Sequence, residues 1–151
     1  MELSLTLPEL PLLETSRGYY TLILLDTNIC IYIINQRPSS VLERFKGFST
    51  GEIGISSIVA AELAFGVEKT GSLRNKQALE LFLAPLSIVA FDAGCVWAYA
   101  KLSAQLEKLG QPIGSLDTMI AAQALALDLP LVTNNQKEFL RVPGLRLENW
   151  V

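Results

Sequence analysis

The chain has 151 residues, of which 50% are hydrophobic, with 12 basic and 15 acidic residues, a net charge of −3 and no histidine. This length suits one domain with a substantial core, and the absence of histidine excludes Ser-His-Asp and Cys-His catalysis and histidine metal ligands. The negative net charge restricts any nucleic-acid binding to local basic patches. The mean hydropathy of +0.36 comes without an apolar run of membrane-spanning length, so it indicates buried sheet and partner-covered surface.

The N-terminal segment up to Tyr19 is acidic and interrupted by Pro8 and Pro11. It lacks the basic start and continuous apolar centre of a signal peptide, so we expect a cytoplasmic protein. Cys30 and Cys95 lie in apolar surroundings without CxxC spacing, which favours core positions over a disulfide or a zinc site.

After Tyr19, hydrophobic periodicity and turn residues predict alternating strands and helices. Such alternation implies parallel strand pairing through right-handed crossovers, with helices on both faces of one sheet. In chain order, we predict a strand over residues 22–25, helices over 27–35 and 41–45, a strand over 52–56, helices over 57–69 and 73–83, a strand over 86–91, helices over 93–109 and 116–127, and strands over 131–133 and 145–147.

Asp26 follows the apolar run 22–25 and is itself followed by Thr27 and Asn28, which open the first helix. Four consecutive apolar residues are typical of a buried parallel strand, and ligands of open α/β sheets bind at the carboxyl edge of such strands. The carboxylate is therefore placed either for chemistry or as a simple cap of the next helix.

Glu62 occupies an unusual position in the helix predicted over residues 57–69. Its neighbours three and four positions away are apolar or small, namely Ile58, Val59, Phe65 and Gly66. A carboxylate on such a face is costly unless it is paired or binds a metal, and no lysine or arginine stands at these positions. The alternative is an edge residue that reaches water.

Asp117 lies in the first turn of the helix predicted over residues 116–127, among Ile113, Gly114, Ile120 and Ala121. A helix dipole favours an acid in this turn whatever the function, so a structural role is an equal alternative. Asn134 and Asn135 follow the strand predicted over 131–133 and could offer an amide oxygen or orient a water. Asn135 with Glu138 three residues later also fits a helix-capping pattern.

Asp26, Glu62 and Asp117 would form an oxygen-ligand pocket suited to Mg²⁺ or Mn²⁺ if they gather at the end of the sheet. A divalent ion there would relieve charge repulsion and activate water for attack on a phosphodiester. Two other classes stay open. One is aspartyl phosphotransfer, against which Asn28 counts because that chemistry favours a second aspartate two positions after Asp26. The other is a non-catalytic binding module.

Four segments carry a resemblance to a known family. They are Leu24-Leu25-Asp26-Thr27-Asn28, residues 55–63 around Ser57 and Glu62, residues 117–122, and Leu131-Val132-Thr133-Asn134-Asn135 with Phe139 and residues 142–145. In this order and spacing, from about Tyr20 to Val151, they resemble PIN-domain toxins of the VapC type.

The resemblance implies a PIN-like three-layer α/β/α sandwich around a central, mainly parallel sheet of four to five strands. It implies a metal-dependent endoribonuclease, with tRNA as the expected substrate class and Mg²⁺, or Mn²⁺, as cofactor. Asp26, Glu62 and Asp117 match the family's catalytic, metal-binding acids, and the supporting positions are Thr27, Asn28, Ser57, Asn134 and Asn135. The family often has a fourth acid at the position of Asn135, so its absence here favours one firmly held metal ion.

The resemblance also implies a VapB-type antitoxin as partner, a homodimer, and contact with DNA only through the antitoxin. Residues 1–19 have no counterpart in the family and are interpreted as an extension, disordered or added by an upstream start, ahead of a single PIN domain over residues 20–151. Four basic residues are candidates for binding RNA phosphates, with solvated surface as the alternative: Lys69, Arg74, Lys137 and Arg141.

Overall fold

The protein is described here from a computed structural model that covers residues 12–15, 18–49 and 51–151, with side chains from Leu22 onward. Its elements alternate between strands and helices through most of the chain. In order they are β1 (Leu12–Thr15), β2 (Gly18–Thr21), β3 (Ile23–Leu25), α1 (Thr27–Asn35), α2 (Ser39–Lys46), β4 (Ile53–Ser56), α3 (Ser57–Thr70), α4 (Leu73–Leu83), β5 (Ser87–Val89), α5 (Ala93–Lys108), α6 (Ser115–Leu127), β6 (Leu131–Val132), α7 (Gln136–Phe139) and β7 (Leu147–Glu148).

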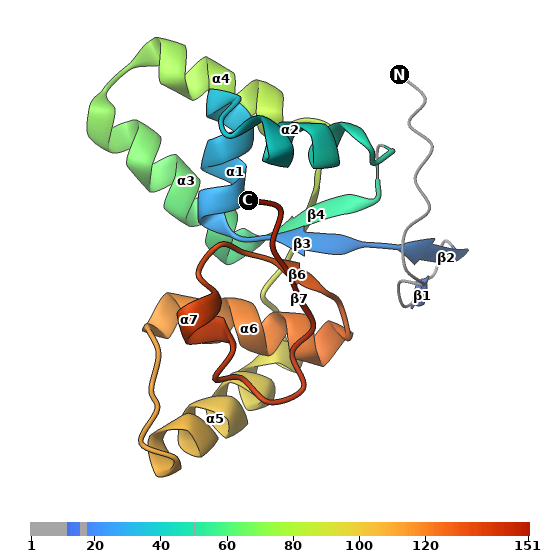
Figure 1. The fold of residues 1–151 in the computed structure, drawn as a ribbon, viewed down its shortest axis with the longest axis vertical. Coiled ribbons are helices and arrows are strands. Elements are labelled where there is room, and N and C mark those ends of the chain that lie inside the picture. Colours follow the sequence, from blue (N-terminus) through green and yellow to red (C-terminus); the bar gives the residue numbers. More distant parts are fainter. Residues whose placement is uncertain (1–11, 16–17, 50) are drawn as a thin grey trace.

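The central sheet has five strands in the order β5-β4-β3-β6-β7, and every pair of neighbours is parallel. Helices α1–α4 cover one face of this sheet, and α5 and α6 cover the other, with α7 beside α6 (Figure 1). The predicted three-layer α/β/α architecture is confirmed. Because parallel neighbours need long crossovers, helices cover both faces and the middle strands can be wholly apolar.

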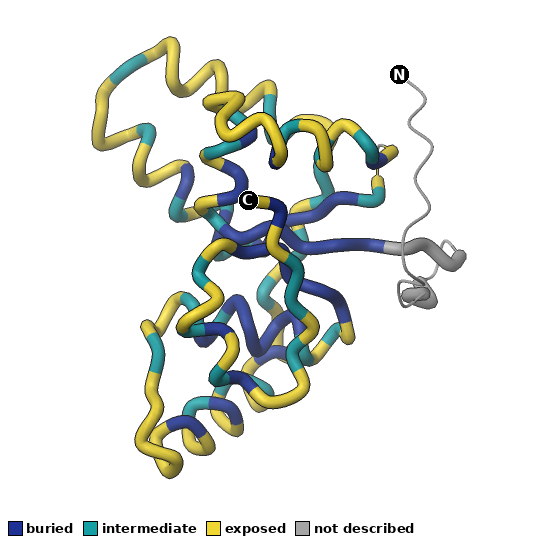
Figure 2. The backbone as a smooth tube through the Cα atoms, in the orientation of Figure 1, coloured by how far each residue is buried: buried dark blue, intermediate teal, exposed yellow. Residues whose placement is uncertain are grey.

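The core follows β3, β4 and β6 and the helix faces that pack on them (Figure 2). Ile23, Leu25, Ile55, Leu131 and Val132 have no exposed surface. Burial of one such side chain stabilises the fold by about 1.5–3 kcal/mol, so the middle of the sheet is its most firmly held part. None of the helices in the described ranges combines the length and the apolar character that a membrane crossing requires.

The predicted elements are found with small shifts. The strand predicted over 86–91 is shorter, at Ser87–Val89, and the last strand lies at Leu147–Glu148 rather than 145–147. Helix α7 forms where the sequence indicates only a capping pattern. The domain boundary predicted after residue 19 falls inside β2, which pairs antiparallel with β1. Disorder is expected for the N-terminal extension, and residues 1–11 and 16–17 of it lie outside the described residues.

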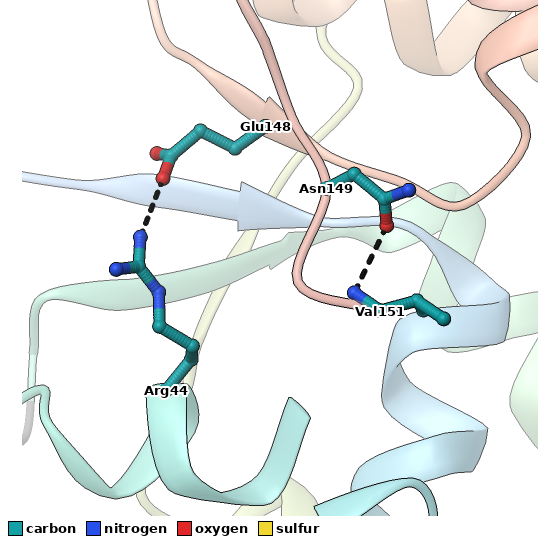
Figure 3. Close-up of polar contacts among 4 residues, drawn as sticks. All are labelled: Arg44, Glu148, Asn149 and Val151. Carbon is teal, nitrogen blue, oxygen red and sulfur yellow. Dashed lines mark hydrogen bonds and ion pairs between the residues drawn. The ribbon is translucent and has the colours of Figure 1, made fainter. Parts of the chain in front are cut away.

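The C-terminal segment is fastened to α2 and to the loop that follows it. Arg44 on α2 forms an ion pair with Glu148 at 2.9 Å, and the backbone N–H of Val151 donates to Asn149 Oδ1 at 3.1 Å (Figure 3). Trp150 is buried and stacks on Phe48 with 5.3 Å between ring centroids. These contacts hold β7 beside β6, the strand that leads into Thr133.

Gly54 in β4 allows the close approach of the neighbouring strand. A Cβ atom at this position would lie 3.0 Å from the carbonyl oxygen of Ser87 and 3.1 Å from Leu22 Cδ1. We therefore expect Gly54→Ala to lower the free energy of unfolding by about 1–3 kcal/mol through overpacking. Urea denaturation followed by circular dichroism measures this change.

Gly66→Ala is the matched control, because Gly66 lies within α3 and a Cβ there meets no atom within 4 Å. This change should stabilise the protein by about 0.5–1 kcal/mol, since alanine favours a helix interior. Equal effects of the two substitutions would contradict the packing described for β4 and β5.

Candidate functional site

The site lies where three neighbouring strands of the sheet end. β3 ends at Leu25, β4 at Ser56 and β6 at Val132, and the polar residues Asp26, Ser57 and Thr133 follow directly. Because parallel strands place their carboxyl ends at one edge, residues far apart in sequence meet there, as shown by Thr133 and Asp26, which are 107 positions apart. Helices α1 and α3 both begin at this edge.

Asp26 is the anchor of the site. It caps α1, with Oδ1 accepting a hydrogen bond from the backbone N–H of Thr27 at 2.8 Å, while Oδ2 accepts one from the Thr133 hydroxyl at 2.8 Å. The residue is only 4% exposed. Burial raises the pKa of Asp26, and the two hydrogen bonds oppose that rise. The capping interpretation of Asp26 is therefore confirmed, and its functional role stays a prediction.

Glu62 projects from α3 toward Thr27 at the start of α1. Burial raises the pKa of Glu62, the negative charge of Asp26 raises it further, and the nearby Thr27 hydroxyl opposes both effects. Glu62 Oε1 and Thr27 Oγ1 are buried and have no hydrogen-bond partner among the described residues. Buried oxygens without partners are costly, so these two are satisfied either by closer approach of the Thr27 hydroxyl to Glu62, which its effect on the Glu62 pKa indicates, or by a ligand.

Asp117 lies in the first turn of α6 and is joined to α7 through Asn135. The Asn135 amide nitrogen donates to Asp117 Oδ2 at 3.4 Å and to Glu138 Oε2 at 3.2 Å. The pKa of Asp117 is raised to about 7, first by burial, then by hydrogen bonding with Glu138 and by the charges of Asp26, Glu138 and Glu62. A carboxyl group so placed keeps its proton near neutral pH unless a cation binds beside it.

The acids therefore converge, but they form two pairs rather than one tight cluster. The first pair is Asp26 and Glu62, because the charge of Asp26 raises the pKa of Glu62. The second pair is Asp117 and Glu138, which both accept from the Asn135 amide. The charges of the first pair also raise the pKa of Asp117. Within the described ranges, no three acidic side chains are close enough to form a ready-made metal site. None of these four carboxylates forms an ion pair with a lysine or arginine among the described residues.

The other supporting positions have different surroundings. Ser57 accepts a hydrogen bond from the backbone N–H of Phe91 at 3.0 Å, which ties α3 to the end of β5. Asn134 is exposed and donates to the Tyr32 hydroxyl at 3.3 Å, while Asn28 is exposed at the start of α1. In the structure the amide nitrogen of Asn135 faces the acids, and the use of its amide oxygen stays a prediction.

The basic candidates are scattered around the site. Lys69 lies over the ring of exposed Phe65, with its ammonium 5.8 Å from the ring centroid, and Arg141 donates to the carbonyl of Pro112 at 2.9 Å. Arg74 on α4 and Lys137 on α7 are exposed. Their contact with RNA stays a prediction.

Sequence patterns do not single out two residues of the site as functional. Glu138 fits only a capping pattern, although its position one helical turn after Asn135 places it on the same side of α7. Thr133 fits the pattern of a strand residue, although a hydroxyl at the end of a buried strand needs a partner, and Asp26 provides it. Both signals are present in the sequence, but neither identifies the partner.

An open cleft of about 310 Å³ extends from the site along α1, α3 and α4. Thr27 and Glu62 lie at one end, and its walls are mainly apolar, including Ile31, Leu63 and Val67. A ligand that filled this cleft would lie against Thr27 and Glu62.

Comparison with known proteins identifies the family of this fold and site. Residues 23–145 match the PIN domain. The chain therefore belongs to the PIN-domain family. Ribonuclease VapC2 of Rickettsia felis is 46% identical over 129 residues, which cover 84% of this chain and 96% of that protein. The tRNA(fMet)-specific endonuclease VapC of Shigella flexneri is 41% identical over 128 residues, covering 84% of this chain and 96% of its own. The resemblance to VapC ribonucleases is thus confirmed.

Solved structures agree with this assignment. In the structure of VapBC2 from Rickettsia felis bound to a promoter DNA fragment, the matched chain is 44% identical, with a TM-score of 0.78, over 87% of this chain and 100% of its own. In DNA-bound VapBC from Salmonella typhimurium, the matched chain is 38% identical, with a TM-score of 0.80. The match again covers 87% of this chain and 100% of that chain. The fold is therefore that of the VapC subunits of VapBC complexes.

The raised pKa of Asp117 predicts a pH-dependent stability in the absence of divalent ions. Between the ordinary value of 3.8 and the folded value of about 7, the folded protein holds a proton that the unfolded chain has lost. Stability should therefore fall as pH rises through this window. Asp117→Asn should reduce this fall, as measured by urea midpoints between about pH 5 and 7.5 in EDTA. An unchanged fall in the variant would assign the proton to another group.

Thr133→Val should destabilise the protein by about 1–3 kcal/mol, because it removes a donor from the buried Asp26 carboxylate. It also removes the acceptor of the Asn135 N–H at 2.9 Å. Thr133→Ser keeps the hydroxyl and serves as the control for lost hydrogen bonds in urea denaturation at neutral pH. Equal loss in both variants would attribute the effect to a change in packing instead.

Proposed function

We propose that this protein is the toxin of a VapBC-type toxin–antitoxin pair, a metal-dependent endoribonuclease whose substrate class is tRNA. The observation that carries the proposal is the meeting of Asp26, Glu62, Asp117 and Glu138 at one sheet edge without a neutralising basic residue among the described residues. The names of the relatives, ribonuclease and tRNA(fMet)-specific endonuclease, support the same activity and substrate class.

The donor set fits a divalent cation such as Mg²⁺, with Mn²⁺ as an alternative. All candidate ligands are oxygens, and the buried oxygens of Glu62 and Thr27 lack partners among the described residues. Asp26, Glu62, Asp117 and Glu138 are the candidate ligands, and they would have to draw together around the ion, because no three of them form a ready-made site among the described residues. When bound, such an ion supplies a nucleophilic water at neutral pH and stabilises charge that develops on a phosphodiester.

The chain's own residues contribute orientation and control of protons. The Thr27 N–H and the Thr133 hydroxyl fix both oxygens of Asp26, so this carboxylate has one orientation. Glu62 Oε1 has no hydrogen-bond partner among the described residues, so it is available as a ligand for the cation. Asp117 must lose its proton before it can act as a ligand.

We also propose a VapB-type antitoxin and a second copy of the chain as partners. The apolar cleft supports the antitoxin, because a segment seated in it would cover Glu62 and Thr27 and block the site. Exposed Trp97, Val96 and Ile88 on α5 and β5 support a homodimer that covers them. With a net charge of −3, the chain is expected to contact DNA only through the antitoxin.

Lys69, Arg74, Lys137 and Arg141 are proposed to hold RNA phosphates. Lys69 and Arg74 flank the end of α3, while Lys137 is adjacent to Glu138 on α7. Charge-reversing substitutions should weaken RNA binding more at low salt than at high salt.

The decisive experiment compares wild type with Glu62→Gln, each purified free of antitoxin, on total RNA and tRNA with Mg²⁺ or Mn²⁺ and with EDTA. Loss of the carboxylate should reduce cleavage by about 10²-fold or more, because it removes preorganised charge at the reacting centre. Glu68→Gln on the exposed end of α3 is the matched control and should retain activity. EDTA and Asp26→Ala should abolish the cleavage.

Cleavage by Glu62→Gln at the wild-type rate would show that the site assignment is wrong. If the folded wild type binds the metal but cuts no RNA in either pool, the chain is instead a non-catalytic binding module.

A further inference from the structure

The Asn135 amide lies between Asp117 and Glu138, two of the acids proposed as metal ligands. Its amide nitrogen lies 3.4 Å from Asp117 Oδ2 and 3.2 Å from Glu138 Oε2 and donates to both. An NH₂ group has no lone pair for a cation, whereas the carbonyl oxygen of the same amide is a good ligand for Mg²⁺. The observed orientation therefore stabilises the carboxylate pair and excludes an ion shared by Asp117, Glu138 and Asn135.

The backbone of Asn135 is fixed while its side chain can rotate. Its N–H donates to Thr133 Oγ1 at 2.9 Å, and its carbonyl accepts from the N–H of Phe139 at 3.3 Å in the first turn of α7. Asn135 Oδ1 makes no hydrogen bond to any residue that the structure describes. The terminal torsion of asparagine is broad and nearly two-fold, so a half-turn exchanges nitrogen and oxygen without moving the main chain.

We propose that Asn135 is a two-state ligand: its amide nitrogen joins Asp117 and Glu138 in the metal-free protein, and a half-turn of the amide presents Oδ1 to a divalent cation. This inference rests on the metal site of the proposed function. It follows that the cation must displace two hydrogen bonds, which lowers its affinity. An acid at the same position would be a permanent acceptor without that cost.

The neighbouring Asn134 provides a matched control. Its amide is directed away from the acids, donating to the Tyr32 hydroxyl at 3.3 Å and accepting from Asn149 at 3.4 Å. A charge added at Asn134 therefore tests the general electrostatic effect of one more carboxylate, without the specific contact that Asn135 makes.

The first measurement is a Mg²⁺ titration of the full-length, antitoxin-free protein, followed through the side-chain NH₂ signals of both asparagines by NMR. The Asn135 NH₂ protons should move upfield as they leave the two carboxylates, while those of Asn134 stay in place. Backbone signals of Thr27 and Glu62 report independently whether the ion binds.

The second measurement is the Mn²⁺ affinity of Asn135→Asp and Asn134→Asp, determined by electron paramagnetic resonance. Asn135→Asp should bind about 10-fold more tightly than wild type because it adds a charged ligand, whereas Asn134→Asp should stay within about 2-fold. Equal gains in the two variants would overturn the inference.

The outcomes also separate this inference from the proposed function. Metal-dependent RNA cleavage, or Mg²⁺ shifts at Thr27 and Glu62, with an unmoved Asn135 amide would overturn the two-state ligand alone. A protein whose signals do not respond to Mg²⁺ at any residue would overturn the metal site and the inference together. The NMR measurement uses wild type, so it decides the question even if Asn135→Asp does not fold.

Discussion

The structure depends on the burial of one carboxylate at the end of the middle strand. Asp26 is held by the N–H of Thr27 on one oxygen and by the hydroxyl of Thr133 on the other, so it joins α1 to the end of β6. A buried charge is tolerated only when its oxygens are satisfied, and here the sheet itself brings the donors. The same contacts that cap a helix therefore also fix the centre of the site.

Glu62, Asp117 and Glu138 lie around Asp26, and no basic residue among the described residues neutralises these acids. Their side chains are held by two different kinds of contact. Asp26 is fixed by a backbone N–H and a buried hydroxyl, whereas Asp117, whose pKa is raised to about 7, is linked to Glu138 by one half-buried amide that can rotate. The repulsion lowers the stability of the metal-free protein, but the buried core of β3, β4 and β6 stabilises the fold independently of the site. One side of the site is therefore firmly held, and the other is the side on which we propose that the Asn135 amide turns toward a cation.

The sequence by itself determined the element types and the parallel sheet and indicated three acids as candidates, because buried strands, helix caps and charges on apolar faces leave local patterns. It also placed Asp26 at the carboxyl edge, since an acid that follows an apolar run of four residues has few other places to lie. The absence of histidine limited the chemistry to carboxylates, hydroxyls, amides and lysines.

Only the tertiary structure decided which polar groups meet. The Thr133 hydroxyl reaches Asp26 across 107 residues, and Glu138 joins Asp117 through Asn135 because α7 packs beside α6. Local patterns give the face on which a side chain lies, but the partner across a sheet edge depends on strand order and register. For that reason, the sequence indicated an acidic site, and the fold alone showed that Asn135 presents its nitrogen to the acids.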